Sequence, residues 1–382
     1  TMNLKTCWRC IGFLVVLLPV LIVAPATAGN GSSANDNPPP QPRSLTWLGT
    51  LPGANHSWAA GVSADGSVVV GRSGPHAFRW TLSGGMQDLG TLGGVNSTAW
   101  DVSADGSVVV GMAISTQVRA FRWTESGGMQ DLGTLGGWRS ESRGVSADGS
   151  VVVGWAENAD LDHHAFRWTE SGGMQDLGTL PPDDVGSVAY DVSADGSVVV
   201  GLAWPSVGEG RAFRWTAAGG MENLGTLGGG LFSEAWGVSA DGSVVVGWAR
   251  NADGDPRAFR WENGVMQDLG TLPGGDGSVA YDVSADGSVV VGGAANAAGQ
   301  SRASRWTQAT GMEDLNQTYA SLLTDGSVLE LAYAISPDGR YIVGRGYNAA
   351  TGRTEAFLLD TARPPIVLVP GIAGTYAADA SA

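Results

Sequence analysis

Ser63-Ala-Asp-Gly-Ser-Val-Val-Val-Gly71 is the segment that says most about the fold, because it recurs along most of the chain. Identical copies begin at Ser103, Ser146, Ser193, Ser239 and Ser284. A seventh, altered copy reads Ser336-Pro-Asp-Gly-Arg-Tyr-Ile-Val-Gly344. An Asp-Gly pair between two apolar runs favours a β-hairpin, because glycine accepts the positive φ that a tight turn requires. The chain is therefore expected to contain seven related hairpins.

Two further segments of nearly constant sequence follow each hairpin. Ala-Phe-Arg-Trp occupies 77–80, 120–123, 165–168, 212–215 and 258–261, and Ala303-Ser-Arg-Trp306 is a variant of it. After a glycine-rich turn comes Met-Gln-Asp-Leu-Gly-Thr-Leu, first at 86–92. The unit repeats every 40 residues (Asp65 to Asp105) to 52 residues (Asp286 to Asp338). Four short strands in a unit of this length predict a β-propeller, and the unbroken Val-Val-Val run predicts a strand covered on both faces.

The repeated unit resembles the HAF repeat of bacterial extracellular proteins. The likeness rests on Gly-Gly-Met-Gln-Asp-Leu-Gly-Thr-Leu-Gly-Gly, Val-Ser-Ala-Asp-Gly-Ser-Val-Val-Val-Gly and Arg-Ala-Phe-Arg-Trp, and it covers residues 44–360. It implies a secreted repeat protein and says little about chemistry.

The two ends of the repeat region complement each other. Leu45-Thr-Trp-Leu-Gly-Thr-Leu51 matches the fourth strand of the unit but precedes the first hairpin, and the seventh unit ends at Ala356-Phe-Leu-Leu359 without a fourth strand. A closed ring resolves both observations and removes exposed end blades. We therefore predict an all-β protein, a seven-bladed propeller of four-stranded antiparallel blades over residues 44–360, closed by the N-terminal strand.

A strand register follows from the position of the glycine-rich turn. If this turn is centred between Ser83 and Gly84, Arg79 lies opposite Asp88, and opposite charges facing each other across two strands are favourable. In the closing blade the same register places Trp47 opposite Leu358.

The first 43 residues are not expected to belong to the propeller. Residues 1–28 read as a secretory signal peptide, with Lys5 and Arg9 before an apolar core and Ala26-Thr-Ala28 as the cleavage site. The signal contains the two cysteines of the chain, so a disulfide or cysteine metal site is not expected after its removal. Residues 29–43 are rich in Gly, Ser, Asn and Pro and predict a disordered linker.

The tail, residues 361–382, carries a second resemblance. Arg363-Pro-Pro-Ile-Val-Leu-Val-Pro-Gly-Ile-Ala-Gly-Thr375 resembles the first strand and oxyanion loop of lipase-like α/β-hydrolases. This implies the possible start of a truncated hydrolase domain. The alternative function is then the N-terminal propeller region of a secreted esterase or lipase whose catalytic domain is missing from this chain.

Composition and motifs favour binding over catalysis. The net charge is −16 and the one lysine lies in the signal, so we expect neither nucleic acid nor a membrane surface as partner, and no stable membrane insertion after signal removal. No Gly-x-Ser-x-Gly, His-Glu-x-x-His or P-loop occurs. We expect a monomeric, secreted binding or interaction module without catalysis of its own, whose ligand is an extracellular glycan or protein. The periplasm and the cell surface are alternative locations.

Two of the four connections in each unit vary in length. The distance from the glycine after Val-Val-Val to the phenylalanine is seven residues from Gly71 to Phe78 and twelve from Gly154 to Phe166. This connection and the one between units lie on the same face of a four-stranded blade. Because binding residues concentrate on variable loops held by a rigid scaffold, we expect a ligand on that face.

Two acidic loops and two histidines are candidates for a metal site. Asp160 and Asp162 in one loop, and Asp253 and Asp255 in another, supply the oxygen ligands that calcium prefers. Such residues are also ordinary turn formers. His163 and His164 adjoin the first loop, where they are candidates for zinc or a ligand, or are simply solvated.

Aromatic residues recur five positions before the turn aspartate. The seven positions are Ala60, Trp100, Arg143, Tyr190, Trp236, Tyr281 and Tyr333. Five aromatic side chains in equivalent places would form a partial ring suited to stacking on sugars, or would pack between blades. Asp101, Asp191 and Asp282 follow three of them and are candidates for a lyase or glycosidase site or for a structural role.

Overall fold

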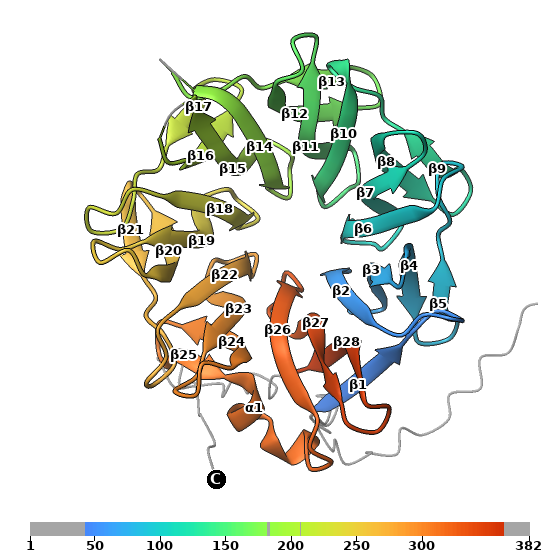
Figure 1. Cartoon of the computed structure of the whole chain (residues 1–382), viewed down its shortest axis with the longest axis vertical. Helices are drawn as coiled ribbons and strands as arrows, with labels where there is room; N and C mark the ends of the chain where they lie inside the picture. Colours follow the sequence, from blue (N-terminus) through green and yellow to red (C-terminus); the bar gives the residue numbers. More distant parts are fainter. Residues whose placement is uncertain (1–42, 182–183, 207, 363–382) are drawn as a thin grey trace, which may run out of the picture. The chain divides into compact units, whose positions relative to one another are not determined.

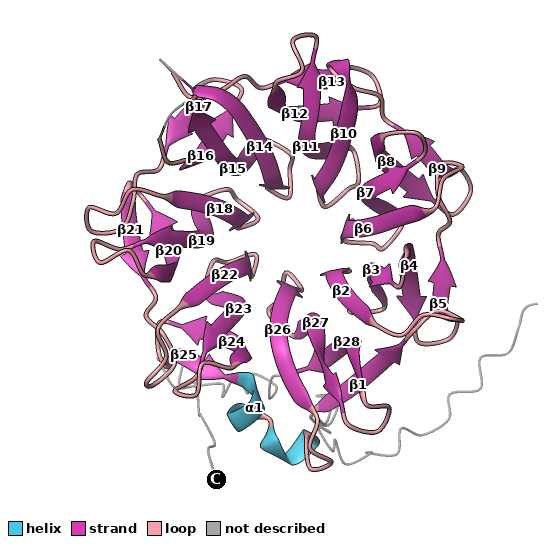
Figure 2. Ribbon diagram, in the orientation of Figure 1, coloured by secondary structure: helices cyan, strands magenta, loops and turns pink. Residues whose placement is uncertain are grey.

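The computed structural model describes residues 43–181, 184–206 and 208–362. They form seven sheets of four antiparallel strands each, arranged around a central axis (Figures 1 and 2). The prediction of an all-β, seven-bladed propeller is confirmed. In the described part of the chain, no helix is both long enough and apolar enough to cross a membrane.

Each of the first six blades is built from four consecutive strands. Blade 1 contains β2 (Ser57–Val62), β3 (Val68–Ser73), β4 (His76–Thr81) and β5 (Gly85–Asp88). Blade 2 contains β6 (Asn96–Val102), β7 (Val108–Ile114), β8 (Val118–Thr124) and β9 (Gly128–Asp131). Blade 3 contains β10 (Gly136–Val145), β11 (Val151–Asn158), β12 (His163–Thr169) and β13 (Gly173–Asp176).

The next three blades follow the same plan. Blade 4 contains β14 (Asp184–Val192), β15 (Val198–Pro205), β16 (Arg211–Thr216) and β17 (Gly220–Asn223). Blade 5 contains β18 (Ser233–Val238), β19 (Val244–Arg250), β20 (Pro256–Glu262) and β21 (Val265–Asp268). Blade 6 contains β22 (Ser278–Val283), β23 (Val289–Ala295), β24 (Ser301–Thr307) and β25 (Gly311–Asp314), and leads into α1 (Leu315–Thr318) and a short 3-10 turn (Ala320–Leu322).

Blade 7 joins the two ends of the repeat region, as predicted. Its strands are β26 (Val328–Ile335), β27 (Tyr341–Asn348), β28 (Arg353–Asp360) and the N-terminal β1 (Ser44–Gly49), which pairs with β28. The innermost strands β26 and β2 are in contact, so the ring is closed (Figure 1). The predicted signal peptide, most of the predicted linker and most of the tail lie outside the described residues.

The predicted register is wrong by one residue. Phe78, and not Arg79, lies opposite Asp88, and Trp47 lies opposite Phe357. The turn is centred on Ser83, because Thr81 pairs with Gly85, which takes a φ of 66°. The three loop residues 82–84 are thus followed by a glycine in the left-handed region, a conformation that glycine adopts without a steric penalty.

Charged side chains still meet between the third and fourth strands, but with other partners. The aspartate of the fourth strand contacts the residue two places before the phenylalanine. The pairs are His76–Asp88 at 2.6 Å, Arg119–Asp131 at 3.8 Å and His164–Asp176 at 2.8 Å. In the closing blade the two apolar residues make an aromatic contact, with the Trp47 and Phe357 rings edge to face at 6.2 Å.

The hydrophobic core lies between the blades. Val68 and Val70 pack with Phe121 and Trp123 of blade 2, whereas Val69 points the other way and packs toward blade 7. Val69 and Val70 are fully buried and Val68 is 4% exposed, so the strand is covered on both faces as predicted. Each Val-Val-Val run therefore joins two interfaces at once.

Backbone and arginine hydrogen bonds add to this packing. In each of the first six blades, the alanine before the turn aspartate donates its N–H to the next blade, from Ala64 N to Ala104 O through to Ala285 N to Pro337 O. Pro337 has no N–H, so the series cannot continue from blade 7 to blade 1. Arg79, Arg167, Arg214 and Arg260 each donate Nε to the turn glycine of the next blade. The Arg-Trp pairs therefore hold the scaffold.

Candidate functional site

Seven side chains from the innermost strands form a closed ring at one mouth of the central channel. They are Trp58, Trp100, Arg143, Tyr190, Trp236, Tyr281 and Tyr333. Each lies in the first strand of its blade, which is the strand next to the channel. The ring lines a cavity of about 520 Å³ together with Ala60 and Arg345.

Successive members of the ring touch. Ring centroids are 5.1 Å apart for Trp58 and Trp100. The guanidinium of Arg143 lies 4.2 Å from the Trp100 ring and 5.7 Å from the Tyr190 ring. The remaining centroid distances are Tyr190–Trp236 6.1 Å, Trp236–Tyr281 4.7 Å, Tyr281–Tyr333 5.0 Å and Tyr333–Trp58 6.0 Å. Contacts between rings, and between a cation and a ring, favour a fixed arrangement.

All five aromatic residues singled out in the sequence belong to this ring, but the sequence did not identify Trp58 or Arg345. Blade 1 has Ala60 at the repeated position, and Trp58, two residues earlier on the same face of β2, fills the space that the alanine leaves. Arg345 comes from the second strand of blade 7 and lies 3.6 Å from Glu330. A search for aromatic residues two places from the repeated position would have found Trp58.

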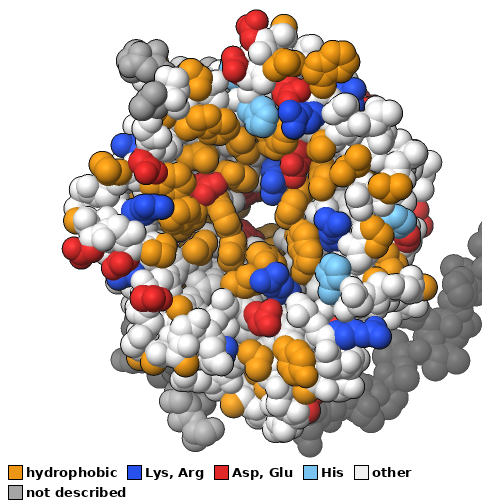
Figure 3. Space-filling view, in the orientation of Figure 1, with side chains coloured by type: hydrophobic (Ala, Val, Ile, Leu, Met, Phe, Trp, Pro, Cys, Tyr) orange, Lys and Arg blue, Asp and Glu red, His pale blue; other side chains and the backbone are white. Residues whose placement is uncertain are grey.

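The cavity opens on the face that carries the variable connections. Figure 3 shows this face, with hydrophobic side chains around the central opening and over the blades next to it. Charged side chains stand at a few places only beside the opening. The ring and the variable connections thus lie on one face, and ligand binding on this face stays a prediction.

Three aspartates line the channel just below the ring. Asp101, Asp191 and Asp282 border a smaller cavity of about 140 Å³ that the ring residues also line. Each carboxylate accepts two backbone N–H groups. One belongs to the next residue of the same strand. The other belongs to the following blade and comes from Val145, Val238 or Ile335, at 2.8–2.9 Å. The three side chains therefore connect blades 2 to 3, 4 to 5 and 6 to 7.

The other interfaces use glycine at the same position. A Cβ on Gly61, Gly144 or Gly237 would lie 3.0 Å from the Cα of the aspartate in the next blade. Aspartate and glycine thus alternate around the ring. Because seven is odd, the alternation cannot close, and Ala334 occupies this place in blade 7.

Burial perturbs the titration of the channel and the ring. It raises the pKa of Asp101 to about 6 and that of Asp282 to about 7, against the hydrogen bonds from backbone amides. Burial, with the charges of Asp282 and Asp101, also raises the pKa of Asp191 well above its usual value. The pKa of the Tyr190 phenol is raised by burial and by Glu234, so its hydroxyl keeps its proton at neutral pH.

Blades 3 and 5 extend the aromatic surface outward from the ring. The Trp155 indole donates to Glu141 at 3.2 Å, and the Trp248 indole donates to Glu234 at 2.9 Å. Trp155 stacks on His163 with centroids 4.3 Å apart. Neighbouring His164 instead bonds Asp176, because successive side chains of a strand point to opposite faces.

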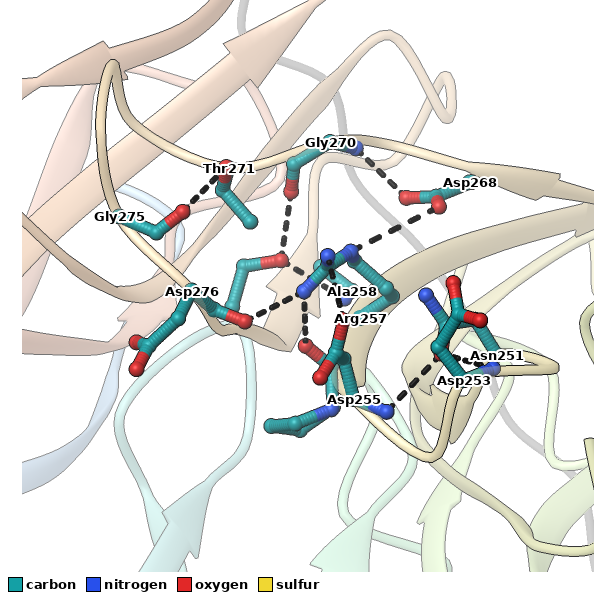
Figure 4. A network of polar contacts seen from close by, with 12 residues as sticks. Asn251, Asp253, Asp255, Arg257, Ala258, Asp268, Gly270, Thr271, Gly275 and Asp276 are labelled. Atoms are coloured by element: carbon teal, nitrogen blue, oxygen red, sulfur yellow. Dashed lines mark hydrogen bonds and ion pairs between the residues drawn. The ribbon is translucent and has the colours of Figure 1, made fainter.

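The two acidic loops are organised by asparagine side chains. Asn251 Oδ1 accepts the backbone N–H groups of Asp253 and Asp255, and Asn158 does the same for Asp160 and Asp162. Figure 4 shows the Arg257 guanidinium between Asp255, at 3.1 Å, and Asp268, at 3.9 Å. In the described ranges, no group of three His, Cys, Asp or Glu side chains is arranged to hold a metal ion.

No protein-family model and no curated protein matches this chain. Solved structures do. An oligogalacturonate lyase in complex with manganese has 12% sequence identity and a TM-score of 0.54, over 83% of this chain and 92% of that chain. At this identity the likeness shows a common fold alone.

Two TolB proteins are also similar. A putative TolB from Agrobacterium tumefaciens has 18% identity and a TM-score of 0.44, over 56% of this chain and 80% of that chain. The TolB from Acinetobacter baumannii has 10% identity and a TM-score of 0.43, over 81% of this chain and 64% of that chain. These scores are too low to support a statement about function.

Proposed function

We propose that the protein is a secreted binding module and that its ligand is a glycan held in the pocket bounded by the aromatic ring. The observation that carries the proposal is the closed series of contacts from Trp58 through Arg143 to Tyr333 around one open cavity. Pockets lined by aromatic side chains with a few polar groups are the usual form of a ligand site.

The chemistry of the pocket suits a sugar. A pyranose presents an apolar C–H face, which packs on aromatic rings, and a polar edge of hydroxyl groups. Arg143 and Arg345 line the same cavity, and each is paired with a glutamate, Glu141 at 3.0 Å and Glu330 at 3.6 Å. Paired groups of both signs offer donors and acceptors to hydroxyls without a large net charge.

The channel aspartates support binding over catalysis. Both oxygens of Asp101, Asp191 and Asp282 accept backbone N–H groups, so these carboxylates hold neighbouring blades together. Membership of the HAF-repeat family and secretion are part of the same proposal. The hydrolase-like segment lies outside the described residues, and no described residue favours the esterase alternative.

A glycan array probed with the labelled chain tests the proposal. We expect binding to a restricted set of glycans, lost on Trp100→Ala or Trp236→Ala and kept on Trp100→Phe, which preserves an aromatic ring. The matched control is Leu82→Ala, an 84% exposed apolar residue in a turn on the opposite face. Unchanged thermal unfolding of each variant shows that the fold is intact.

Two results would overturn the proposal. One is a wild-type chain that binds no glycan on the array. The other is binding that survives both alanine substitutions but is lost on Leu82→Ala.

A further inference from the structure

A second cavity, of about 460 Å³, lies at the outer edge of the same face, between blades 2 and 3. Gln117 of blade 2 and five residues of blade 3 line it: Trp138, Arg139, Glu157, Leu161 and His163. The Trp138 side chain is 63% exposed and Leu161 is 51% exposed. A large aromatic side chain left in solvent beside a cavity has no role in blade packing.

A buried carboxylate fixes the position of this tryptophan. Glu157 is 2% exposed and accepts the backbone N–H groups of Trp138 at 3.0 Å and Arg139 at 3.1 Å, and Arg139 Nε at 2.7 Å. Burial acts to raise the pKa of Glu157, but these amide bonds and the Arg139 charge outweigh it and lower the pKa. Burying a charge is costly unless it is fully paired, so the arrangement holds the Trp138 loop in one conformation.

The fold does not require this arrangement. The position of Glu157, three residues after the glycine that follows Val-Val-Val, is occupied in the other blades by Gly74, Ile114, Trp204, Arg250, Ala295 and Tyr347. Leu161 adopts a φ of 70°, a left-handed conformation that leucine rarely takes. Backbone strain of this kind concentrates at functional sites. Blade 3 therefore carries a feature that serves something other than the ring.

The two cavities are connected along blade 3 by direct contacts. From the ring, Arg143 pairs with Glu141 at 3.0 Å, and Glu141 accepts from the Trp155 indole at 3.2 Å. Trp155 stacks on His163, which lines the outer cavity. A continuous series of polar and aromatic contacts thus runs from the channel mouth to the rim.

We propose that the outer cavity is a second sugar-binding site, with Trp138 as its stacking platform, and that the ligand is an oligosaccharide chain lying along blade 3 from the ring to the rim. This inference rests on the proposed function. The platform is a single aromatic ring flanked by hydrogen-bonding groups, as a sugar needs. A protein partner would instead require a continuous surface of about 800 Å².

The polar groups of the outer cavity match sugar hydroxyls. The Arg139 side chain is 51% exposed, so part of its guanidinium is free to donate. Burial lowers the pKa of His163, so the neutral imidazole offers one donor and one acceptor at neutral pH. The fixed loop keeps the platform in place before the ligand arrives, which reduces the ordering cost of binding.

The test is a chain-length series of the best glycan from the array, from disaccharide to hexasaccharide, titrated calorimetrically into the full chain. We expect the wild-type affinity to rise with length. Trp138→Ala should lower the affinity for the hexasaccharide by about tenfold, the worth of one aromatic contact, and leave the disaccharide unaffected. Trp138→Phe should retain most of the gain with length. Because Trp138 is exposed, thermal unfolding should not change.

The outcomes separate the two proposals. If Trp138→Ala has no effect at any length while Trp100→Ala abolishes binding, the second site is refuted and the proposed function stands. An affinity that does not depend on length in the wild type also refutes it. If no glycan of any length binds, both proposals fail. If Trp138→Ala abolishes binding and Trp100→Ala does not, the rim site stands and the ring site fails.

Discussion

The three channel aspartates predict an unusual dependence of stability on pH. Burial raises the pKa of Asp101 to about 6, that of Asp282 to about 7 and that of Asp191 well above the usual 3.8. Well below pH 3.8 these groups are protonated in the folded and the unfolded chain alike. As the pH rises to 7, these carboxyl groups ionise in the unfolded chain at a lower pH than in the folded chain. The free energy of unfolding therefore falls.

The size of the effect follows from the same values. A difference of one between folded and unfolded pKa corresponds to about 1.36 kcal/mol. The rise from 3.8 to about 6 therefore costs the folded state about 3 kcal/mol at pH 8, and the rise to about 7 costs about 4 kcal/mol. Asp191 adds to this in the same direction.

The turn aspartates act at lower pH and with the opposite sign. Hydrogen bonds from Ser150 and Ser243 lower the pKa of Asp148 and of Asp241 to about 2. Their contribution to stability is present above pH 4 and is lost below it, and solvent screens it because both groups are exposed. The stability of the protein should thus be greatest at about pH 4, and should decline toward neutral pH.

The assay is urea unfolding followed by circular dichroism at intervals from pH 4.5 to pH 8. Asp282→Asn removes one of the three titrating groups, so it should make the decline shallower whatever its effect on stability at a single pH. Asp148→Asn is the control and should leave the decline above pH 5 unchanged. An unfolding midpoint that is constant or rises from pH 5 to pH 8, or an Asp282→Asn variant with the wild-type slope, would exclude the channel aspartates as the cause.

Three further predictions concern the scaffold. Phe357→Ala should lower the free energy of unfolding by about 3–5 kcal/mol, because it empties a fully buried site and removes the ring on which Trp47 packs. Deletion of residues 44–49 should lower the melting temperature as well, and an unchanged melting curve would contradict closure of the ring by β1. Arg167→Lys should lower the free energy of unfolding by about 1 kcal/mol, because it removes the Nε hydrogen bond to the Gly196 carbonyl at 3.1 Å. The control in denaturant unfolding is Arg122→Lys, since Arg122 Nε lacks a hydrogen-bond partner among the described residues, and equal losses of stability in the two variants would exclude this role. Gly144→Ala should lower the free energy of unfolding by about 1–3 kcal/mol, because the added Cβ would lie 3.0 Å from the Asp191 Cα. A Gly144→Ala variant with wild-type stability in denaturant unfolding would contradict this close contact between blades 3 and 4.

The features that repeat could be predicted from the amino-acid sequence. The Asp-Gly turns, the Val-Val-Val runs and the spare strand at Leu45–Leu51 are local signals, each carried by a few neighbouring residues, and together they predict blade number, strand number and ring closure. The sequence also places the variable connections on one face, because antiparallel pairing puts alternate connections on opposite faces of a blade, and it predicts a ligand on that face.

Which side chains meet could not be predicted and is seen first in the folded chain. The register depends on where a three-residue loop is centred, and a change of half a residue there exchanges Arg79 for Phe78 opposite Asp88. Trp58 enters the ring because blade 1 leaves a space at Ala60, which depends on the positions of blades 2 and 7.

The aspartates and Glu157 show the same limit. In the sequence Asp101 is an acidic residue beside a repeated aromatic position, and its role as a link to Val145 becomes visible only when two blades stand side by side. Glu157 and Trp138 are 19 residues apart and meet because β10 and β11 are paired. Repeats determine local structure through short-range backbone preferences, whereas contacts between blades depend on distances that the closed ring alone sets.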